Sequence, residues 1–270
     1  MNTSAKKGLS AAVLKNIAVI TMTLDHVTAF ILKAYLVSNG MTRYYNNEWY
    51  ALGRYIGRIA FVLYAFMLAE GAMKTRSKVK YAARLLALAV ISIVPHSYVQ
   101  TGKLFNPDDL NIFFPLFLGL ITIYAYQWLK DKLEQPVLSF VGRLALVAAS
   151  CAVAVLLKFE YGLMGILLML VCYIFRYDRR KMVLGIFLVN TAGYMLNVVV
   201  RSGAVQWFER NSGNIIPALI NTDRTQLFGI LAIPLILMYN GEKGRQLPKA
   251  FYYFYYPVHL GIIALIVNFM

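Results

Sequence analysis

Cysteine is nearly absent from this chain, and charged side chains are few. The two cysteines, Cys151 and Cys172, both lie within apolar segments, where a cysteine usually packs as a small hydrophobic residue. They form no disulfide framework and no cluster with metal-ligand spacing, so neither a metal site nor a cysteine nucleophile is expected. Charged residues make up only 14% of the 270 residues, whereas hydrophobic residues make up 60%. This balance excludes an ordinary soluble domain and predicts an all-α, polytopic membrane protein.

Acidic residues are also scarce. Twelve aspartates and glutamates stand against 27 lysines and arginines, which gives a net charge of +15. Such an excess can indicate a nucleic-acid partner, but here the basic residues collect in short loops between apolar runs, the topology signal of a membrane protein. We therefore expect a lipid bilayer, and no nucleic acid, as partner. A cleavable signal peptide is not expected, because the first apolar segment is too long and lacks a small-residue cleavage site.

The apolar runs predict a single transmembrane domain over residues 13–270, preceded by a polar, disordered cytoplasmic segment at 1–12. Nine spans are expected, at about 13–37, 50–73, 79–100, 111–130, 137–157, 161–176, 181–200, 226–240 and 250–269. The sixth and eighth are short for helices of about 20 residues and should be tilted, distorted or partly re-entrant. An outer loop at about 201–225 is long enough for a lid or acceptor-binding loop, or is a surface connector.

The lysines and arginines predict the orientation. Alternate loops are rich in these residues, and the intervening loops hold far fewer. By the positive-inside rule the N-terminus is then cytoplasmic and the C-terminus extracytoplasmic, as in a multi-pass protein of a bacterial cytoplasmic membrane.

Lys15 and His26, on the first apolar segment, are the most informative pair. At about 100° per residue, eleven steps return almost to the starting angle, so both residues lie on one face of a helix. At 1.5 Å per residue they lie roughly 16 Å apart, about half of the ~30 Å hydrocarbon thickness. Ionisable side chains at such depth are usually retained for function, although a histidine can also simply stabilise helix packing.

Asp25 precedes His26, but neighbouring residues on a helix point about 100° apart, so an Asp–His dyad is not implied. Asp25 is expected to pair with a cation on another helix, either Arg58 or Arg54. Arg54 is able to extend to the outer interface. Arg58 lies about two turns inside the span, and is either the structural partner of Asp25 or a direct contact of substrate or cofactor.

Three further polar residues are candidates for substrate binding. His96 follows Pro95, which should kink the third span, and a structural role at the interface competes with a catalytic one. His259 lies near mid-membrane behind Pro257 and is the next candidate after His26. Asn111 is a weaker candidate, since an intramembrane asparagine often only bridges helices.

A basic cluster follows the second span, at its inner end. It either enforces topology and attracts anionic lipid, or holds the phosphates of a cytoplasmic cofactor. Glu70, four residues before Lys74, is expected to form a surface ion pair with it. The cluster consists of Lys74, Arg76, Lys78, Lys80 and Arg84.

Five segments, in order, resemble the TraX family of membrane acetyltransferases. They are LKNIAVITMTLDH, GRIAFVLYAFMLAEG, NIFFPLFLGL, QLFGILAIPLI and FYYFYYPVHL, and the resemblance covers nearly the whole chain. The first also resembles the wider transmembrane acyltransferase family 3 pattern of a basic residue, ten residues and then histidine, here Lys15 and His26. One departure is Pro95-His96-Ser97, where an aromatic residue and then an acid are expected after the proline. The acceptor of the family's namesake, the N-terminus of a pilin, is therefore not carried over, and acceptor identity stays open.

The resemblance implies transfer of an acetyl or similar acyl group from cytoplasmic acyl-CoA, such as acetyl-CoA, to an extracytoplasmic amine or hydroxyl on a small molecule or peptide. His26 would be the base that activates the acceptor, or would relay the acyl group, and Asp25 and Arg58 complete the predicted catalytic group. Arg58 or an asparagine would stabilise the developing oxyanion. The CoA phosphates would be held by Lys15, Lys74, Arg76, Lys80 and Arg84, and the acceptor by Arg54, His96, Asn111 and His259.

Two other classes compete with an enzyme. A transporter or flippase would use His26, Arg58 and His259 along a proton or substrate path, but should show paired repeats, and none is found. A structural membrane partner without chemistry is disfavoured by the cost of ionisable residues at depth.

Overall fold

The structure is a computed structural model that describes residues 7–193, 195–196, 199 and 225–270. Among these residues every regular element is a helix, and the two β-bridges are isolated pairs. The predicted all-α fold class is therefore confirmed for the described part of the chain. The outer loop predicted at about 201–225 lies outside the described residues, except for its last residue, Thr225.

The described helices fall into nine stretches, each overlapping one predicted span. The first three stretches are each divided by a change of helix type or a break: α1 (Ala11–His26) with η1 (Val27–Leu32) and α2 (Lys33–Ser38), α3 (Glu48–Gly57) with α4 (Ile59–Lys74), and α5 (Lys78–Ile91) with α6 (Ile93–Thr101). The others are α7 (Phe113–Lys132), α8 (Pro136–Leu156), α9 (Gly162–Ile174), α10 (Arg179–Leu188) with η3 (Val189–Gly193), η4 (Thr225–Leu231) with α14 (Ala232–Leu237), and α15 (Lys249–Asn268).

Five of these stretches are long and apolar enough to cross a membrane: Ala11–Ser38, Glu48–Lys74, Lys78–Thr101, Pro136–Leu156 and Lys249–Asn268. The sixth and eighth stretches are short, as their sequence predicts. Helix α9 has 13 residues and so extends only about 20 Å, less than the ~30 Å of a hydrocarbon core. The chain is thus a multi-pass membrane protein with five candidate spans, while the nine-span topology and its orientation stay predictions.

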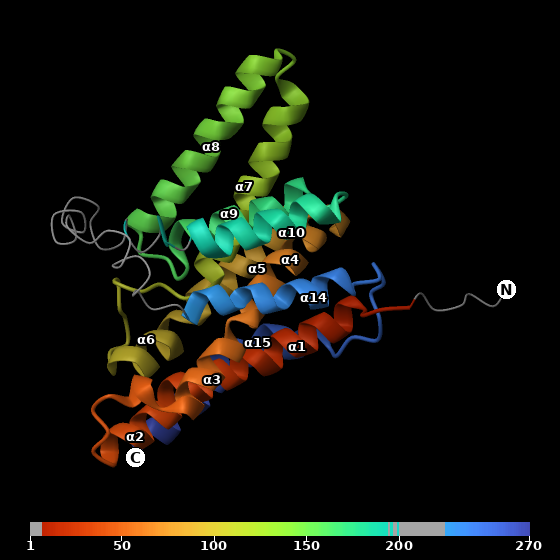
Figure 1. Ribbon diagram of the computed structural model, residues 1–270. Helices are drawn as coiled ribbons and strands as arrows, with labels where there is room; N and C mark the ends of the chain where they lie inside the picture. Colours follow the sequence, from red (N-terminus) through yellow and green to blue (C-terminus); the bar gives the residue numbers. More distant parts are fainter. Residues whose placement is uncertain (1–6, 194, 197–198, 200–224) are drawn as a thin grey trace, which may run out of the picture.

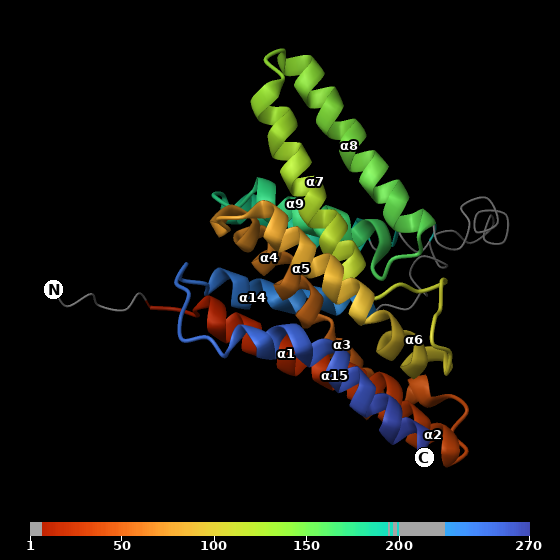
Figure 2. The same cartoon turned by 180° about the vertical axis from the view of Figure 1, so that it is seen from behind.

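Figures 1 and 2 place the loops at two ends of the helical body. The start of α1, the α4–α5 turn, the α9–α10 turn and the loop between α14 and α15 lie at one end, which we call the basic end. Its cations include Lys15, Lys74, Arg179, Lys243 and Lys249. The α2–α3 connection, α6 and the C-terminus lie at the opposite end. Helices α7 and α8 form an antiparallel hairpin that projects from this body at a steep angle.

The centre of the body is built on α4 and α9. Both helices are apolar around most of their circumference, and such helices are stable only when neighbours cover every side. Leu63 of α4 and Ile166 and Met169 of α9 have no exposed surface. Helix α4 packs against α1, α7 and α9, and α9 also packs against α8 and α10. This core fixes α1 on one side of α4.

The loop between α14 and α15 covers the start of α1. The backbone N–H groups of Ala11 and Ala12, which have no acceptor within the helix, donate to the carbonyls of Glu242 and Lys243 at 2.8 and 3.0 Å. Leu9 pairs with Tyr239 in one of the isolated bridges. These bonds order Leu9 to Ala12, which the sequence assigned to a disordered segment, because they satisfy the first backbone donors of α1. Residues 1–6 of that segment lie outside the described residues.

Two interruptions in the long helices lie beside candidate residues. The α-helix changes to a π-helix directly after His26, a feature that often marks functional sites. In the third stretch α5 ends at Ile91, the residue whose carbonyl Pro95 cannot bond because proline has no N–H. The kink predicted at Pro95 is therefore confirmed.

Candidate functional site

His26 faces His259 across the contact between α1 and α15. The two ring nitrogens His26 Nδ1 and His259 Nε2 are 2.7 Å apart, a hydrogen-bond distance. The ring centroids are 5.0 Å apart and the planes differ by 13°, so the two rings lie edge to edge and nearly coplanar. His259 is 7% exposed and His26 is half-buried, so the second imidazole lies behind the first. The structure thus brings together two residues that the sequence could only propose separately.

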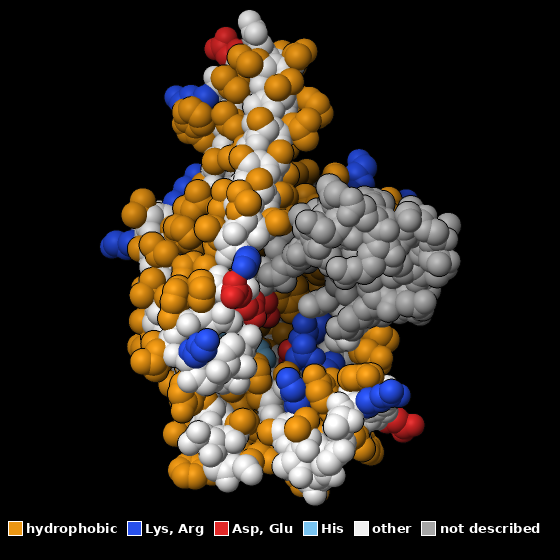
Figure 3. All heavy atoms as spheres, turned by 90° about the vertical axis from the view of Figure 1, so that its left-hand side faces the viewer, with side chains coloured by type: hydrophobic (Ala, Val, Ile, Leu, Met, Phe, Trp, Pro, Cys, Tyr) orange, Lys and Arg blue, Asp and Glu red, His pale blue; other side chains and the backbone are white. Residues whose placement is uncertain are grey.

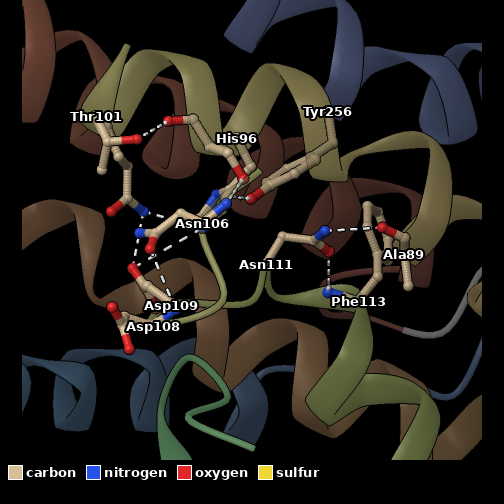
Figure 4. A network of polar contacts seen from close by, with 11 residues as sticks. Ala89, His96, Thr101, Asn106, Asp108, Asp109, Asn111, Phe113 and Tyr256 are labelled. Carbon is tan, nitrogen blue, oxygen red and sulfur yellow. Dashed lines mark hydrogen bonds and ion pairs between the residues drawn. The ribbon is translucent and has the colours of Figure 1, made fainter. Parts of the chain in front are cut away.

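Tyr256 connects this pair to the third histidine of the chain. Its ring meets the ring of His26 edge to face at 5.8 Å, and its hydroxyl lies 3.2 Å from His96 Nδ1. Figure 4 shows His96 and Tyr256 pointing toward one another. On its other side, His96 Nε2 is 2.9 Å from the amide nitrogen of Gln100, which in turn donates to Asp109 at 2.8 Å. All three histidines therefore belong to one polar cluster drawn from α1, α6 and α15.

Asp25 pairs with both arginines that the sequence offered as alternatives, so that prediction is confirmed. Its Oδ1 lies 2.9 Å from Arg54 Nη1, and its Oδ2 bonds Arg58 Nη2. The side chains of Asp25 and Arg58 are 7% and 5% exposed, whereas Arg54 is 24% exposed. Because a buried carboxylate needs compensation for its lost hydration, the two guanidinium groups explain how Asp25 is tolerated within a span.

Two glycines of α3 allow this pairing. Positions 53 and 57 lie one turn apart on the helix face that meets α1. A Cβ atom on Gly57 would collide with the Asp25 side chain, and one on Gly53 would collide with Thr28. Small residues at such spacing let membrane helices approach closely. The sequence segment LGRYIGR therefore supplies the approach and the cations together.

Tyr161 lies on the far side of Arg58. Its ring stacks on Phe61 at 3.7 Å and lies 5.9 Å from the guanidinium carbon of Arg58. Its backbone is left-handed, with φ of 64°, a conformation that costs energy for a bulky residue and often marks functional sites. Arg58 Nε has no hydrogen-bond partner among the described residues, so this buried guanidinium keeps one donor free.

Two acidic residues lie close together near the same cations, Glu160 in the loop before α9 and Asp109 in the loop before α7. Glu160 is half-buried, and its N–H donates to Leu110 O at 3.1 Å. Desolvation and repulsion from Asp109 raise the pKa of Glu160 to about 8, against the attraction of Arg58. Figure 3 shows a hollow on this face of the molecule, with Lys or Arg, Asp or Glu and His side chains at its walls, beside residues that are not described.

Sequence reasoning missed Glu160, Tyr161, Asp109 and Tyr256. A signal existed for Glu160, which is one of only 12 acidic residues and stands between two apolar runs, in LLKFEYGLMG. Tyr256 was hidden among 19 tyrosines, most of which are expected at membrane interfaces. No local sequence pattern distinguishes Tyr256, which contacts His26 and His96, from the other tyrosines.

The side-chain amide of Asn111 forms hydrogen bonds with two backbone groups. Its Nδ2 donates to Ala89 O at 2.8 Å, and its Oδ1 accepts from Phe113 N at 3.1 Å. It is 1% exposed. These bonds hold the entry into α7 against α5 (Figure 4), and a substrate contact by Asn111 stays a prediction.

Lys15 lies at the basic end, eleven residues before His26 on the same helix. Its ammonium is 5.4 Å from the ring centre of Tyr252, whose hydroxyl donates to Asn16 at 2.8 Å. Lys243 and Lys249 are near enough to act electrostatically on Lys15. The structure therefore adds two lysines, one from the loop that covers α1 and one from the start of α15, to the cation that the sequence singled out.

The predicted cluster after α4 is partly occupied by structural contacts. Lys74 forms an ion pair with Glu70 at 2.6 Å, as predicted, and donates to the hydroxyl of Tyr239 at 3.2 Å. Arg84 lies 5.9 Å from the rings of both Tyr81 and Tyr253. The remaining members, Arg76, Lys78 and Lys80, are exposed. Their role in CoA binding stays a prediction.

The arrangement combines groups suited to proton transfer with groups suited to anion stabilisation. Imidazoles supply the first, and the free donor of Arg58 supplies the second. Within the described residues, no three His, Cys, Asp or Glu side chains are grouped so that they could hold a metal ion.

Comparison with known proteins adds two findings. The family model described as TraX protein matches residues 10–267 of the chain. A curated relative, the probable fimbrial assembly protein FimC, serogroup H1, of Dichelobacter nodosus, is 27% identical over 261 residues, which are 94% of each chain. No solved structure matches.

Proposed function

Because the chain belongs to the TraX family, we propose that it is an integral membrane acyltransferase that moves an acetyl group from acetyl-CoA to an extracytoplasmic amine. The proposal rests chiefly on one observation, the convergence of all three histidines on a single cluster, with the Asp25–Arg58 pair beside it. Polar groups of this kind at membrane depth are costly and are usually retained for function. The TraX family name supports acetyl transfer as the reaction.

The chemistry needs a base near the reacting nitrogen. A neutral acceptor amine attacks the thioester carbonyl carbon, so that a C–N bond forms and the C–S bond breaks. The nitrogen loses one proton, which His26 accepts, and the departing thiolate takes a proton to become the CoA thiol. Arg58 stabilises the negative charge that develops on the carbonyl oxygen, because its Nε is buried and without a partner among the described residues.

Asp25 acts on this reaction through Arg58. By pairing with Nη2, the carboxylate fixes the guanidinium plane and balances its charge. A free buried arginine would instead be expensive and would adopt several orientations. Asp25 is therefore a positioning residue in the proposed mechanism. The more exposed Arg54 pairs with the other oxygen of the Asp25 carboxylate.

The basic end is suited to binding the acyl donor, acetyl-CoA. Lys15, Lys243 and Lys249 supply cations for the phosphates of CoA at the start of α1. His26 follows eleven residues later, roughly 16 Å along the same helix at 1.5 Å per residue. An extended pantetheine arm is a suitable shape for this separation, since it is narrow and carries the thioester at its tip. The predicted cytoplasmic entry of acyl-CoA follows from the positive-inside rule.

An amine acceptor is favoured over a hydroxyl. Asp109 lies near Glu160, on the side away from the basic end, and its carboxylate attracts an incoming ammonium group. The relative from Dichelobacter nodosus is named a probable fimbrial assembly protein, which favours an exported protein subunit as the acceptor. The proposed acceptor is thus the N-terminal amine of such a subunit.

The test compares wild-type protein, His26→Ala and Gly261→Ala. Gly261 is the matched control, because a Cβ atom there meets nothing within 4 Å. Purified proteins in lipid nanodiscs are first titrated with acetyl-CoA. Surface peptides from cells producing each form are then searched by mass spectrometry for an added acetyl group.

The proposal expects saturable acetyl-CoA binding by all three forms, and acetylated peptides with wild type and Gly261→Ala only. Near-normal acetylation by a correctly inserted His26→Ala would overturn the assignment of the base. Absence of acetyl-CoA binding by the wild type would overturn acyl transfer and favour the transporter class.

A further inference from the structure

His259 makes two hydrogen bonds, one with each ring nitrogen. Nδ1 lies 2.8 Å from the backbone carbonyl oxygen of Tyr255, one turn earlier on α15. Nε2 lies 2.7 Å from Nδ1 of His26. The contact with the Tyr255 carbonyl determines which ring nitrogens of His259 and His26 carry hydrogens, because a carbonyl oxygen can only accept a hydrogen bond.

The hydrogen-bond donor in each of the two contacts can be assigned one after the other. His259 Nδ1 must carry the hydrogen that it donates to Tyr255 O. In a neutral imidazole the other nitrogen, Nε2, then has a lone pair and no hydrogen. The short contact to His26 therefore requires His26 Nδ1 to carry a hydrogen and donate it. In a neutral His26 this leaves the lone pair on Nε2.

Nε2 of His26 is also the free nitrogen of the pair. No hydrogen bond to it is found among the described residues, and the His26 side chain is half-buried. Its other neighbours are the rings of Phe30, at 6.0 Å, and Tyr256, at 5.8 Å. Among the described residues, the lone-pair nitrogen of His26 thus has no hydrogen-bond partner that would occupy it.

The two helices are held in register around this contact. Tyr252 donates to Asn16 at 2.8 Å, and the hydroxyls of Tyr255 and Thr23 lie 2.6 Å apart. The His26–His259 bond is the next along the same line. Both helices run from the basic end to the opposite end (Figures 1 and 2), so the three polar pairs succeed one another along the contact. In this register the two imidazoles lie edge to edge, with 13° between their planes.

We propose that His259 is a positioning residue that, through its bond to the Tyr255 carbonyl, fixes His26 in the Nδ1–H tautomer and leaves His26 Nε2 as the proton acceptor. His259 itself does not contact the acceptor substrate. The role of Nε2 in catalysis rests on the proposed acyl transfer, whereas the tautomer itself does not.

The tautomer is measurable directly, because the chain has only three histidines. Protein labelled with ¹⁵N in the histidine rings gives six ring nitrogens, and two-bond ¹H–¹⁵N spectra distinguish protonated from bare nitrogens. His96→Gln and His26→Ala assign the signals. The spectra are recorded at neutral pH on full-length protein in nanodiscs, for wild type, His259→Phe, His259→Gln and Gly261→Ala.

Wild-type His26 is expected to be protonated at Nδ1 and bare at Nε2. His259→Phe should lose this preference, and His259→Gln should keep it, since the Gln carbonyl oxygen replaces the accepting Nε2. Gly261→Ala is the matched control on the same helix, because a Cβ atom there meets nothing within 4 Å, and His26 should keep its tautomer.

Kinetics supply the second measurement. His259→Phe should lower kcat by roughly 10²–10⁴-fold with KM for acetyl-CoA unchanged, the range expected when a catalytic histidine loses its correct tautomer. His259→Gln should recover most of the loss, which a merely structural defect would not allow. A thermal melt identifies variants that fail to fold. If His259→Phe does not fold, His259→Gln is compared with the wild type instead.

Three results would decide against the proposal. These are a wild-type His26 protonated at Nε2, an unchanged tautomer in folded His259→Phe, and an unchanged kcat in that variant. The expected tautomer in a protein that transfers no acetyl group would overturn the proposed function, and would support the tautomer assignment alone.

Discussion

Gly57 of α3 lies directly against the carboxylate of Asp25 of α1, with no space between them for a Cβ atom. The same turn of α3 ends at Arg58, which bonds that carboxylate. One residue without a side chain therefore brings two helices close enough for a buried ion pair. Helix packing and the electrostatics of the candidate site depend on each other at this point.

Replacing Gly57 by alanine should lower both stability and acetyl transfer. The new methyl group must displace Asp25 or separate α1 from α3, at an expected cost of about 1–3 kcal/mol for overpacking. Gly261→Ala is the control, because its methyl group meets nothing within 4 Å. Thermal melts of both variants in the same detergent make the comparison. Equal melting temperatures would contradict the close approach.

Asp25→Asn should destabilise the protein strongly, because it leaves Arg58 and Arg54 without their counter-charge. Arg58 is 5% exposed, and breaking a buried pair by removing one partner costs about 3 kcal/mol or more. Adding Arg58→Gln to Asp25→Asn should recover part of the loss, since the unpaired buried cation is then gone. The four proteins of this double-mutant cycle are compared by proteolysis under increasing denaturant. Simple additivity of the two losses would argue against the pairing.

Stability should fall as the pH rises from about 4.5 to about 8, through the ionisation of Glu160. Its folded pKa of about 8 lies above the ordinary value of 4.5, so in this window the folded chain holds a proton that the unfolded chain releases. The contribution of this group is complete below the lower value and lost above the upper one. Melting temperatures between pH 5 and pH 9 should therefore decline less in Glu160→Gln than in the wild type.

Glu134→Gln is the control for this experiment. Glu134 is exposed at the turn between α7 and α8, and its replacement should leave the pH profile of the wild type unchanged. An identical slope in Glu160→Gln and the wild type would show that Glu160 ionises normally.

Lys15→Ala should weaken acetyl-CoA binding more than Lys74→Ala. The sequence predicts phosphate contacts for both, but Lys74 is already engaged with Glu70 and Tyr239. Loss of one charge-assisted hydrogen bond corresponds to roughly a tenfold rise in Kd. Calorimetric titration of each variant with acetyl-CoA measures the difference. A larger effect at Lys74 would place the phosphates at the α4–α5 turn instead.

Several features of the fold follow from sequence alone for identifiable reasons. The apolar runs predict the position of each helical stretch, because burial of backbone polar groups in lipid allows only internally bonded helices. The proline at position 95 predicts the break between α5 and α6. The ion pairs of Asp25 and of Glu70 were also foreseeable, the first because few cations lie at membrane depth, and the second because its members are four residues apart.

The candidate site was only partly foreseeable. His26 and Arg58 stand out because ionisable groups within apolar runs are rare. Tyr161 and Glu160, the neighbours of Arg58, come from a loop about 100 residues later, and no sequence period connects them. The cations near Lys15 likewise come from the loop before α15 and from the first residue of that helix, more than 220 residues away.

By itself, then, the sequence determined the class of the protein, its helices and the ionisable residues within apolar segments that are candidates for function. These features depend only on the composition of each segment. The tertiary structure alone decided which of them meet. His26 and His259 are 233 residues apart, and their contact follows from the register of α15 on α1, set by side-chain pairs such as Asn16 with Tyr252. That register, rather than any motif, engages Nδ1 of His26 and leaves Nε2 without a hydrogen-bond partner among the described residues.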